Sequence, residues 1–138
     1  MGLILDSTVF IDAERRGQTV VMTLERLARR FKDVDVAISV VTAAELVHGV
    51  WRASDASLRA RREAFVEEVF ARVPARPLGL AVARIVGRID AEARRKGTTL
   101  PMADLWIGAT ALDLGFAVAT ANVRHFRLVP RLKVRVVH

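Results

Sequence analysis

The chain has 138 residues, of which 52% are hydrophobic and 27% charged, and it contains no Cys. A chain of this length can bury about two-thirds of its unfolded surface without a disulfide or structural metal, so we expect a single domain over residues 1–138. The absence of Cys excludes disulfide scaffolds, thiolate metal sites and a cysteine nucleophile, and it fits a reducing cytoplasm. The 22 Lys and Arg against 15 Asp and Glu give a net charge of +7, which favours a polyanionic or acidic partner.

No membrane segment is predicted. The first residues, Met1 to Asp6, have no basic region and meet a charge after three apolar residues, unlike a signal peptide. The longest apolar region, 105–121, is interrupted by Asp113. We therefore expect a soluble, cytoplasmic protein.

Short apolar runs alternate with segments of helical spacing along the chain. Four runs predict strands: Leu3–Leu5, Val36–Val40, Phe116–Ala119 and Val134–Val137. Four longer segments predict helices: Val20–Phe31, Leu58–Val73, Val82–Ile89 and Pro101–Leu114. Strands that alternate with helices indicate an α/β fold with a parallel sheet.

The predicted helix from Pro101 to Leu114 is apolar on nearly every side, which is typical of a central, buried helix. Asp104 is the only ionisable residue between Pro101 and Leu112. A carboxylate carried into the core needs a cation or a set of hydrogen-bond donors, so Asp104 is a candidate site residue.

Three further oxygen-bearing side chains follow predicted strands: Asp6, Glu45 and Asn122. In a parallel sheet the carboxyl ends of the strands form the edge where ligands bind. Each residue alone is also explained as a helix cap or Asx turn, and Glu45 stands at capping-box spacing from Thr42. Thr8 can orient Asp6 or act as a cap.

Caps do not explain why these residues converge on one edge of the sheet. Two carboxylates about 4 Å apart repel by about 4 kcal/mol at an effective dielectric constant of 20, so a cluster of acids requires a cation. Oxygen ligands without Cys or paired His select Mg²⁺ or Mn²⁺. Such an ion supports attack of water on a phosphodiester, and the basic surplus suits a nucleic acid substrate.

Four motifs, in this order, resemble those of the PIN-domain ribonucleases and, within them, of the VapC toxins of bacterial toxin–antitoxin pairs. The similarity spans the chain through these segments: Leu5-Asp6-Ser7-Thr8-Val9-Phe10-Ile11, Thr42-Ala43-Ala44-Glu45-Leu46-Val47-His48-Gly49, Ala103-Asp104-Leu105-Trp106-Ile107-Gly108-Ala109-Thr110-Ala111 and Ala119-Thr120-Ala121-Asn122-Val123-Arg124-His125-Phe126.

The resemblance implies a three-layer α/β/α fold with four to five short parallel strands and cleavage of RNA that depends on Mg²⁺ or Mn²⁺. It also implies a homodimer and inhibition by a cognate VapB antitoxin. By position Asp6, Glu45 and Asp104 correspond to the acidic triad that holds the metal. Asn122 takes the fourth position as a ligand or water-positioning group, and Thr8 and Thr120 are expected to support the site. His125 stands where the family often has an Asp, which weakens the case for a second metal ion.

Two other readings remain open from the residues. A basic nucleic-acid-binding module, or an inactive PIN module, would use the carboxylates only as caps. A haloacid-dehalogenase-like phosphatase would use a nucleophilic Asp6, but its second Asp would fall at Thr8. The three histidines, His48, His125 and His138, are assigned no chemistry, and Trp51 is a candidate contact for an antitoxin or a second copy.

Overall fold

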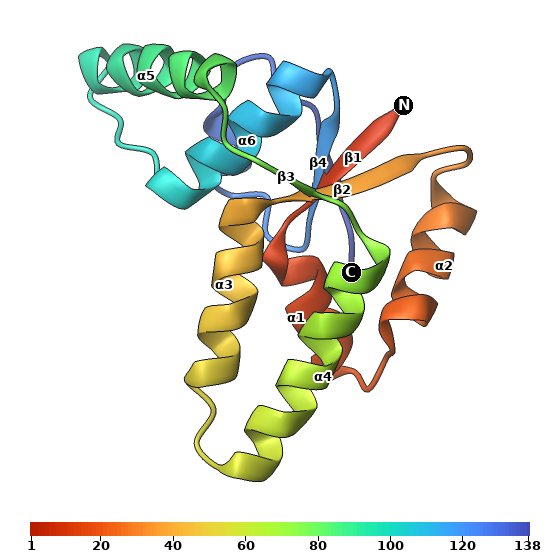
Figure 1. Cartoon of the computed structure of the whole chain (residues 1–138). Coiled ribbons are helices and arrows are strands. Elements are labelled where there is room, and N and C mark those ends of the chain that lie inside the picture. The colour runs from red at the N-terminus through yellow and green to blue at the C-terminus, as the bar shows by residue number, and fades with distance from the viewer.

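The computed structural model describes residues 1–138 and contains a five-stranded sheet in the order β3-β2-β1-β4-β5, with every pair of neighbours parallel. The strands are β1 (Gly2–Leu5), β2 (Asp35–Ser39), β3 (Ala75–Arg76), β4 (Ala117–Thr120) and β5 (Val134–Val136). The predicted α/β fold with a parallel sheet is therefore confirmed (Figure 1).

Helices cover both faces of this sheet (Figure 1). They are α1 (Ser7–Arg15), α2 (Val20–Arg30), α3 (Val40–Trp51), α4 (Ala56–Arg72), α5 (Leu80–Arg95) and α6 (Met102–Leu114), with a short 3₁₀ helix, η1 (Phe126–Leu128), between β4 and β5. No helix is long and apolar enough to cross a membrane.

The alternation of β1 side chains shows how the three layers form. Leu3 and Leu5 pack into the core cluster that includes residues of α1, α2, α3 and α4. Ile4, between them, points to the opposite face and packs with Ile107 and Ala111 of α6. The sheet is thus buried on both sides, as the three-layer expectation requires.

The central, buried position predicted for the helix at 101–114 is confirmed. In α6, Leu105, Ile107, Ala109 and Ala111 are fully buried, and the helix packs against the sheet and against α5. Gly115 ends α6 in the left-handed region at φ 69°, which a residue without Cβ adopts at little cost.

Two boundaries differ from the prediction for a local reason. Val40, taken as the last strand residue, is the first residue of α3, because Ser39 ends β2 and also caps the helix: its hydroxyl accepts a hydrogen bond from the Val41 amide at 3.1 Å. The capping box from Thr42 to Glu45 is therefore wrong. Three elements, α1, β3 and η1, match no predicted segment.

Candidate metal centre

Asp6 follows β1 and is 4% exposed. It occupies the N-cap position of α1, yet its side chain makes no capping hydrogen bond. Its Oδ2 atom instead accepts hydrogen bonds from the hydroxyls of Thr8, at 2.7 Å, and Thr120, at 2.8 Å. The cap interpretation of Asp6 is therefore wrong.

Backbone amides fix both hydroxyls in place. The Thr8 Oγ1 accepts from the amide of Ala121 at 3.0 Å, and the Thr120 Oγ1 accepts from the amide of Asn122 at 3.0 Å. Each hydroxyl has a single proton, and a charged carboxylate is a stronger acceptor than the neutral Asn122 carbonyl, which also lies 3.0 Å from Thr120 Oγ1. The structure thus holds Asp6 by one oxygen and leaves its Oδ1 atom free.

Glu45 lies on α3, beyond its first turn, and is half-buried. Its Oε1 atom is buried and has no hydrogen-bond partner. The pKa of Glu45 is raised, first because burial disfavours its charge and next because of the negative charge of Asp6, with a smaller contribution from Asp104; the Ser7 hydroxyl opposes the shift.

Asp104 lies in the first turn of α6 and is also half-buried. Burial, followed by the charge of Asp6, raises the pKa of Asp104, and His125 opposes that rise. Sequence reasoning assigned His125 no chemistry, but its Nδ1 lies 3.0 Å from Asp104 Oδ2. The signal available in the sequence was its place in the fourth motif, at a position where the family often has an acid.

Asn122 is exposed, and its amide Oδ1 accepts a hydrogen bond from the backbone amide of Arg124 at 3.3 Å. This is the local turn that was considered as the alternative to a ligand. Asn122 nevertheless lies two residues after Thr120, and its backbone amide donates to the Thr120 hydroxyl, so its backbone belongs to the network around Asp6.

The donor set fits a divalent cation. Asp6, Glu45 and Asp104 come from β1, α3 and α6, and the charge of Asp6 raises the pKa of each of the other two. No three His, Asp or Glu side chains already surround a single metal-sized position. However, the buried, partnerless Oε1 of Glu45 and the free Oδ1 of Asp6 are hard oxygen donors whose mutual repulsion a cation would relieve.

The raised pKa values predict how stability depends on pH without metal. At Glu45 and Asp104 the folded chain binds protons more tightly than the unfolded chain, so stability increases as pH falls from neutral through the raised pKa values, down to their ordinary values of 4.5 and 3.8. Thermal unfolding in EDTA checks this. Glu45→Gln should be more stable than the parent at pH 7, and the difference should shrink by pH 5; an equal difference at both pH values contradicts the assignment.

Two candidate contacts outside the acidic cluster lie at the surface. His48 is exposed, as expected of a helix-surface residue. Trp51 is 67% exposed at the end of α3, and the Arg59 guanidinium lies 5.3 Å from the centre of its ring. Of the apolar residues of α4 nearby, Val66 and Val69 are buried in the core, whereas Phe65 and Phe70 are partly buried, so Trp51 provides most of the exposed apolar surface at this place.

Comparisons with known proteins agree with this fold. The model of the PIN domain family matches residues 3–132. Ribonuclease VapC10 of Mycobacterium tuberculosis is 35% identical, covering 95% of this chain and 90% of its own length, and Ribonuclease VapC of Rickettsia bellii is 28% identical, covering 97% and 95%. The solved VapBC-5 structure of M. tuberculosis aligns with a TM-score of 0.74 at 30% identity, covering 99% and 98% of the two chains. The chain therefore belongs to the PIN domain family and, within it, to the VapC ribonucleases.

Proposed function

We propose that this chain is an endoribonuclease of the VapC toxin type that depends on Mg²⁺ or Mn²⁺. The observation that carries the proposal is the buried Oε1 atom of Glu45, which has no hydrogen-bond partner and lies near two further acids, Asp6 and Asp104, whose negative charges contribute to the raised pKa of Glu45. The names of the relatives, which are ribonucleases, support RNA as the substrate.

The chain's own residues have separable roles in this reaction. Asp6, Glu45 and Asp104 supply the oxygen donors, and the hydroxyls of Thr8 and Thr120 keep Asp6 in a fixed orientation. When bound, the divalent ion lowers the pKa of a water molecule and neutralises charge on the phosphate. Glu45, whose pKa is raised by burial and by its acidic neighbours, is suited to accept a proton from the attacking water.

We keep the proposed role of Asn122 as a fourth ligand or water-positioning group, at an exposed position two residues after the end of β4. Arg124 follows Asn122 in the loop and Arg127 lies in η1; both are exposed and make no ion pair, and no acid follows Asp113 in the sequence. Unpaired cations in this segment suit the phosphates that flank a cleavage site.

The solved relatives also support the proposed partners. They include VapBC-5, a member of the VapBC family of toxin–antitoxin systems, and VapBC of Salmonella typhimurium bound to DNA. We extend to this chain a VapB-like antitoxin and a homodimer acting in the cytoplasm, with the exposed Trp51 as one candidate contact.

Two observations count against the other two interpretations, the binding module and the phosphatase. The binding module without catalysis required carboxylates that act only as caps, but neither the Asp6 nor the Glu45 side chain makes a capping hydrogen bond. The phosphatase required an acid at position 8, where the Thr8 hydroxyl donates to Asp6 instead.

Incubation of RNA with the purified chain tests the proposal. We expect discrete cleavage with Mg²⁺ or Mn²⁺, none in EDTA, and none with Asp6→Ala assayed side by side. Sequencing the new RNA ends then gives the cleavage site. Equal cleavage by the parent and Asp6→Ala, or cleavage that persists in EDTA, would overturn the proposal.

A further inference from the structure

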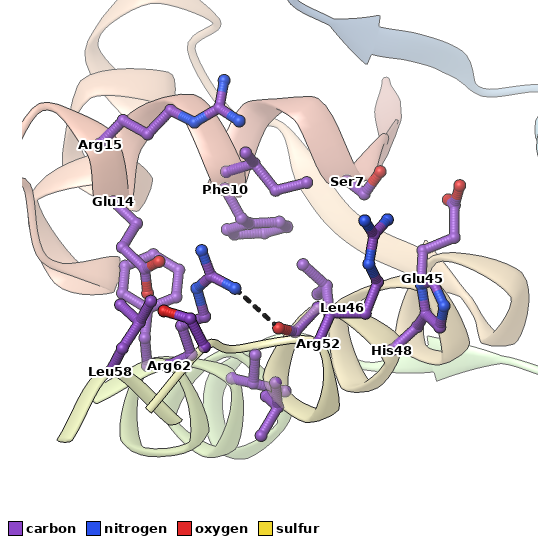
Figure 2. A pocket seen from close by; sticks show the side chains of 16 residues that line it. Ser7, Phe10, Glu14, Arg15, Glu45, Leu46, His48, Arg52, Leu58 and Arg62 are labelled. Atoms are coloured by element: carbon purple, nitrogen blue, oxygen red, sulfur yellow. Dashed lines mark hydrogen bonds between the residues drawn. The ribbon is translucent and has the colours of Figure 1, made fainter. Parts of the chain in front are cut away.

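A cavity of about 630 Å³ lies between α1, α3 and α4, and we name it the α1–α4 pocket (Figure 2). Sixteen residues line it, of which seven are hydrophobic. Its size falls in the range of about 300–1,000 Å³ that is usual for sites binding small ligands. None of the roles assigned so far uses this space.

The pocket is continuous with the acidic cluster. Glu45 lines it at one end, and so does Ser7, the neighbour of Asp6 (Figure 2). A polymer whose phosphate lies at Glu45 must continue on either side of that point. The α1–α4 pocket is a partly open space in which one flanking unit of such a polymer can lie.

Cations predominate among the charged groups that line the pocket. Arg15, Arg52 and Arg62 line it, against Glu14 and Glu45. The guanidinium of Arg62 donates to the Gly49 carbonyl at 2.9 Å, whereas Arg15 and Arg52 are exposed and make no ion pair or side-chain hydrogen bond. Figure 2 shows Arg15 and Arg52 on opposite walls, on α1 and at the end of α3. Unpaired guanidinium groups beside an apolar surface are suited to a phosphate attached to an aromatic base.

The apolar part of the lining can contact a base. Phe10, Leu46, Leu58 and Phe65 line the pocket, and Leu58 and Phe65 are only partly buried. Bases of single-stranded RNA stack on aromatic side chains such as Phe65 and pack against apolar ones. Bases inside a duplex are not available for this contact.

We propose that the α1–α4 pocket binds the nucleotide next to the scissile phosphate of single-stranded RNA, with its base on the apolar lining near Leu58 and Phe65 and its phosphate on Arg52 and Arg15. This inference rests on the proposed function, since it assumes that the scissile phosphate lies at Glu45. A peptide of the antitoxin is the competing occupant. The unpaired cations and the shared Glu45 favour RNA, and the experiment separates the two.

The test measures binding of a fluorescent, six-nucleotide single-stranded RNA by fluorescence anisotropy. The buffer contains EDTA, so that the RNA is not cleaved during the measurement. Arg52→Ala is compared with Arg61→Ala, which removes the same charge from an exposed residue of α4 outside the pocket. Loss of a charged hydrogen bond is expected to raise Kd about tenfold for Arg52→Ala, and Arg61→Ala should change it less than about twofold. Equal changes in both variants would overturn the inference.

A second measurement uses the absence of Cys from the chain. Ser54→Cys places a thiol on the pocket lining, and Ser57→Cys places one nearby on α4 but outside it. Both serines are exposed, so neither substitution disturbs the core. A bulky maleimide on Ser54→Cys should weaken binding of the RNA about tenfold, and the same label on Ser57→Cys should not.

The outcomes distinguish this inference from the proposed function. The parent is expected to cleave RNA with Mn²⁺. If neither Arg52→Ala nor the label on Ser54→Cys changes this cleavage, the proposed ribonuclease function stands and the pocket assignment is overturned. Selective loss of RNA binding in these two variants, from a chain that cleaves no RNA, supports the pocket and contradicts the proposed function. If both changes weaken only binding of an antitoxin peptide, the pocket is a protein-docking site and the inference is wrong.

Discussion

Replacing Asp104 with asparagine is expected to lower kcat/KM for RNA cleavage by about 10³ or more. Asparagine has nearly the same volume and can still bond to His125, but it removes one of three charges that would hold the divalent ion. A factor of about 10³ corresponds to about 4 kcal/mol of transition-state stabilisation, which is within the range that a metal ion contributes. The rate of cleavage of a short RNA at saturating Mn²⁺ measures it.

Asp113→Asn is the matched control for this variant. Asp113 lies on the same helix, α6, but is exposed and far along it from Asp104. The Asp113→Asn variant should cleave RNA at the parental rate. If Asp104→Asn also retains full activity, Asp104 has no part in the reaction and the acidic cluster is structural.

The same Asp104→Asn variant is expected to be more stable than the parent without metal and to lose the stabilisation that metal gives the parent. Removing one of the mutually repelling charges should raise Tm in EDTA, by about 4 °C for each kcal/mol of repulsion relieved in a chain of this size. In the parent, an ion at 100 times its Kd stabilises the folded state by about 2.7 kcal/mol, a Tm increase of about 10 °C.

Differential scanning calorimetry with EDTA, Mg²⁺ or Mn²⁺ measures both effects. Asp113→Asn again serves as the control and should keep the parental response to metal. A lower Tm for Asp104→Asn in EDTA would mean that the carboxylate stabilises the folded chain through its protein contacts, as a capping network would. A parental response to Mn²⁺ in that variant would remove Asp104 from the ligand set.

The sequence predicted the parts of the fold and site that depend on local pattern. An apolar helix with one carboxylate identified both α6 and Asp104, because burial on all sides leaves a distinctive composition. Asp6 directly follows an apolar strand, and the predicted parallel sheet therefore placed it at the edge where the strands end. By contrast, the start of α3 was missed because Val40 and Val41 extend an apolar run, while Ser39 decides the boundary through a single hydrogen bond.

Contacts between distant segments could not be predicted from pattern alone. The Thr120 hydroxyl reaches Asp6 across 114 positions of the sequence, and His125 reaches Asp104 across 21. The first contact depends on the pairing of β1 with β4, where Leu5 lies opposite Ala119, and the second joins the segment after β4 to α6. The α1–α4 pocket was not predicted either, since its lining comes from three helices whose packing no local spacing encodes.

The central claim is that Asp6, Glu45 and Asp104 bind a divalent ion and that RNA cleavage requires it. The most direct measurement is a titration of Mn²⁺ into the metal-free parent. Electron paramagnetic resonance measures the concentration of free Mn²⁺ at each step, and the rate of RNA cleavage is measured in parallel. The account predicts that cleavage rises with occupancy of a site that Asp6→Ala lacks. Full cleavage before any Mn²⁺ binds, or unchanged Mn²⁺ binding in Asp6→Ala, would contradict it.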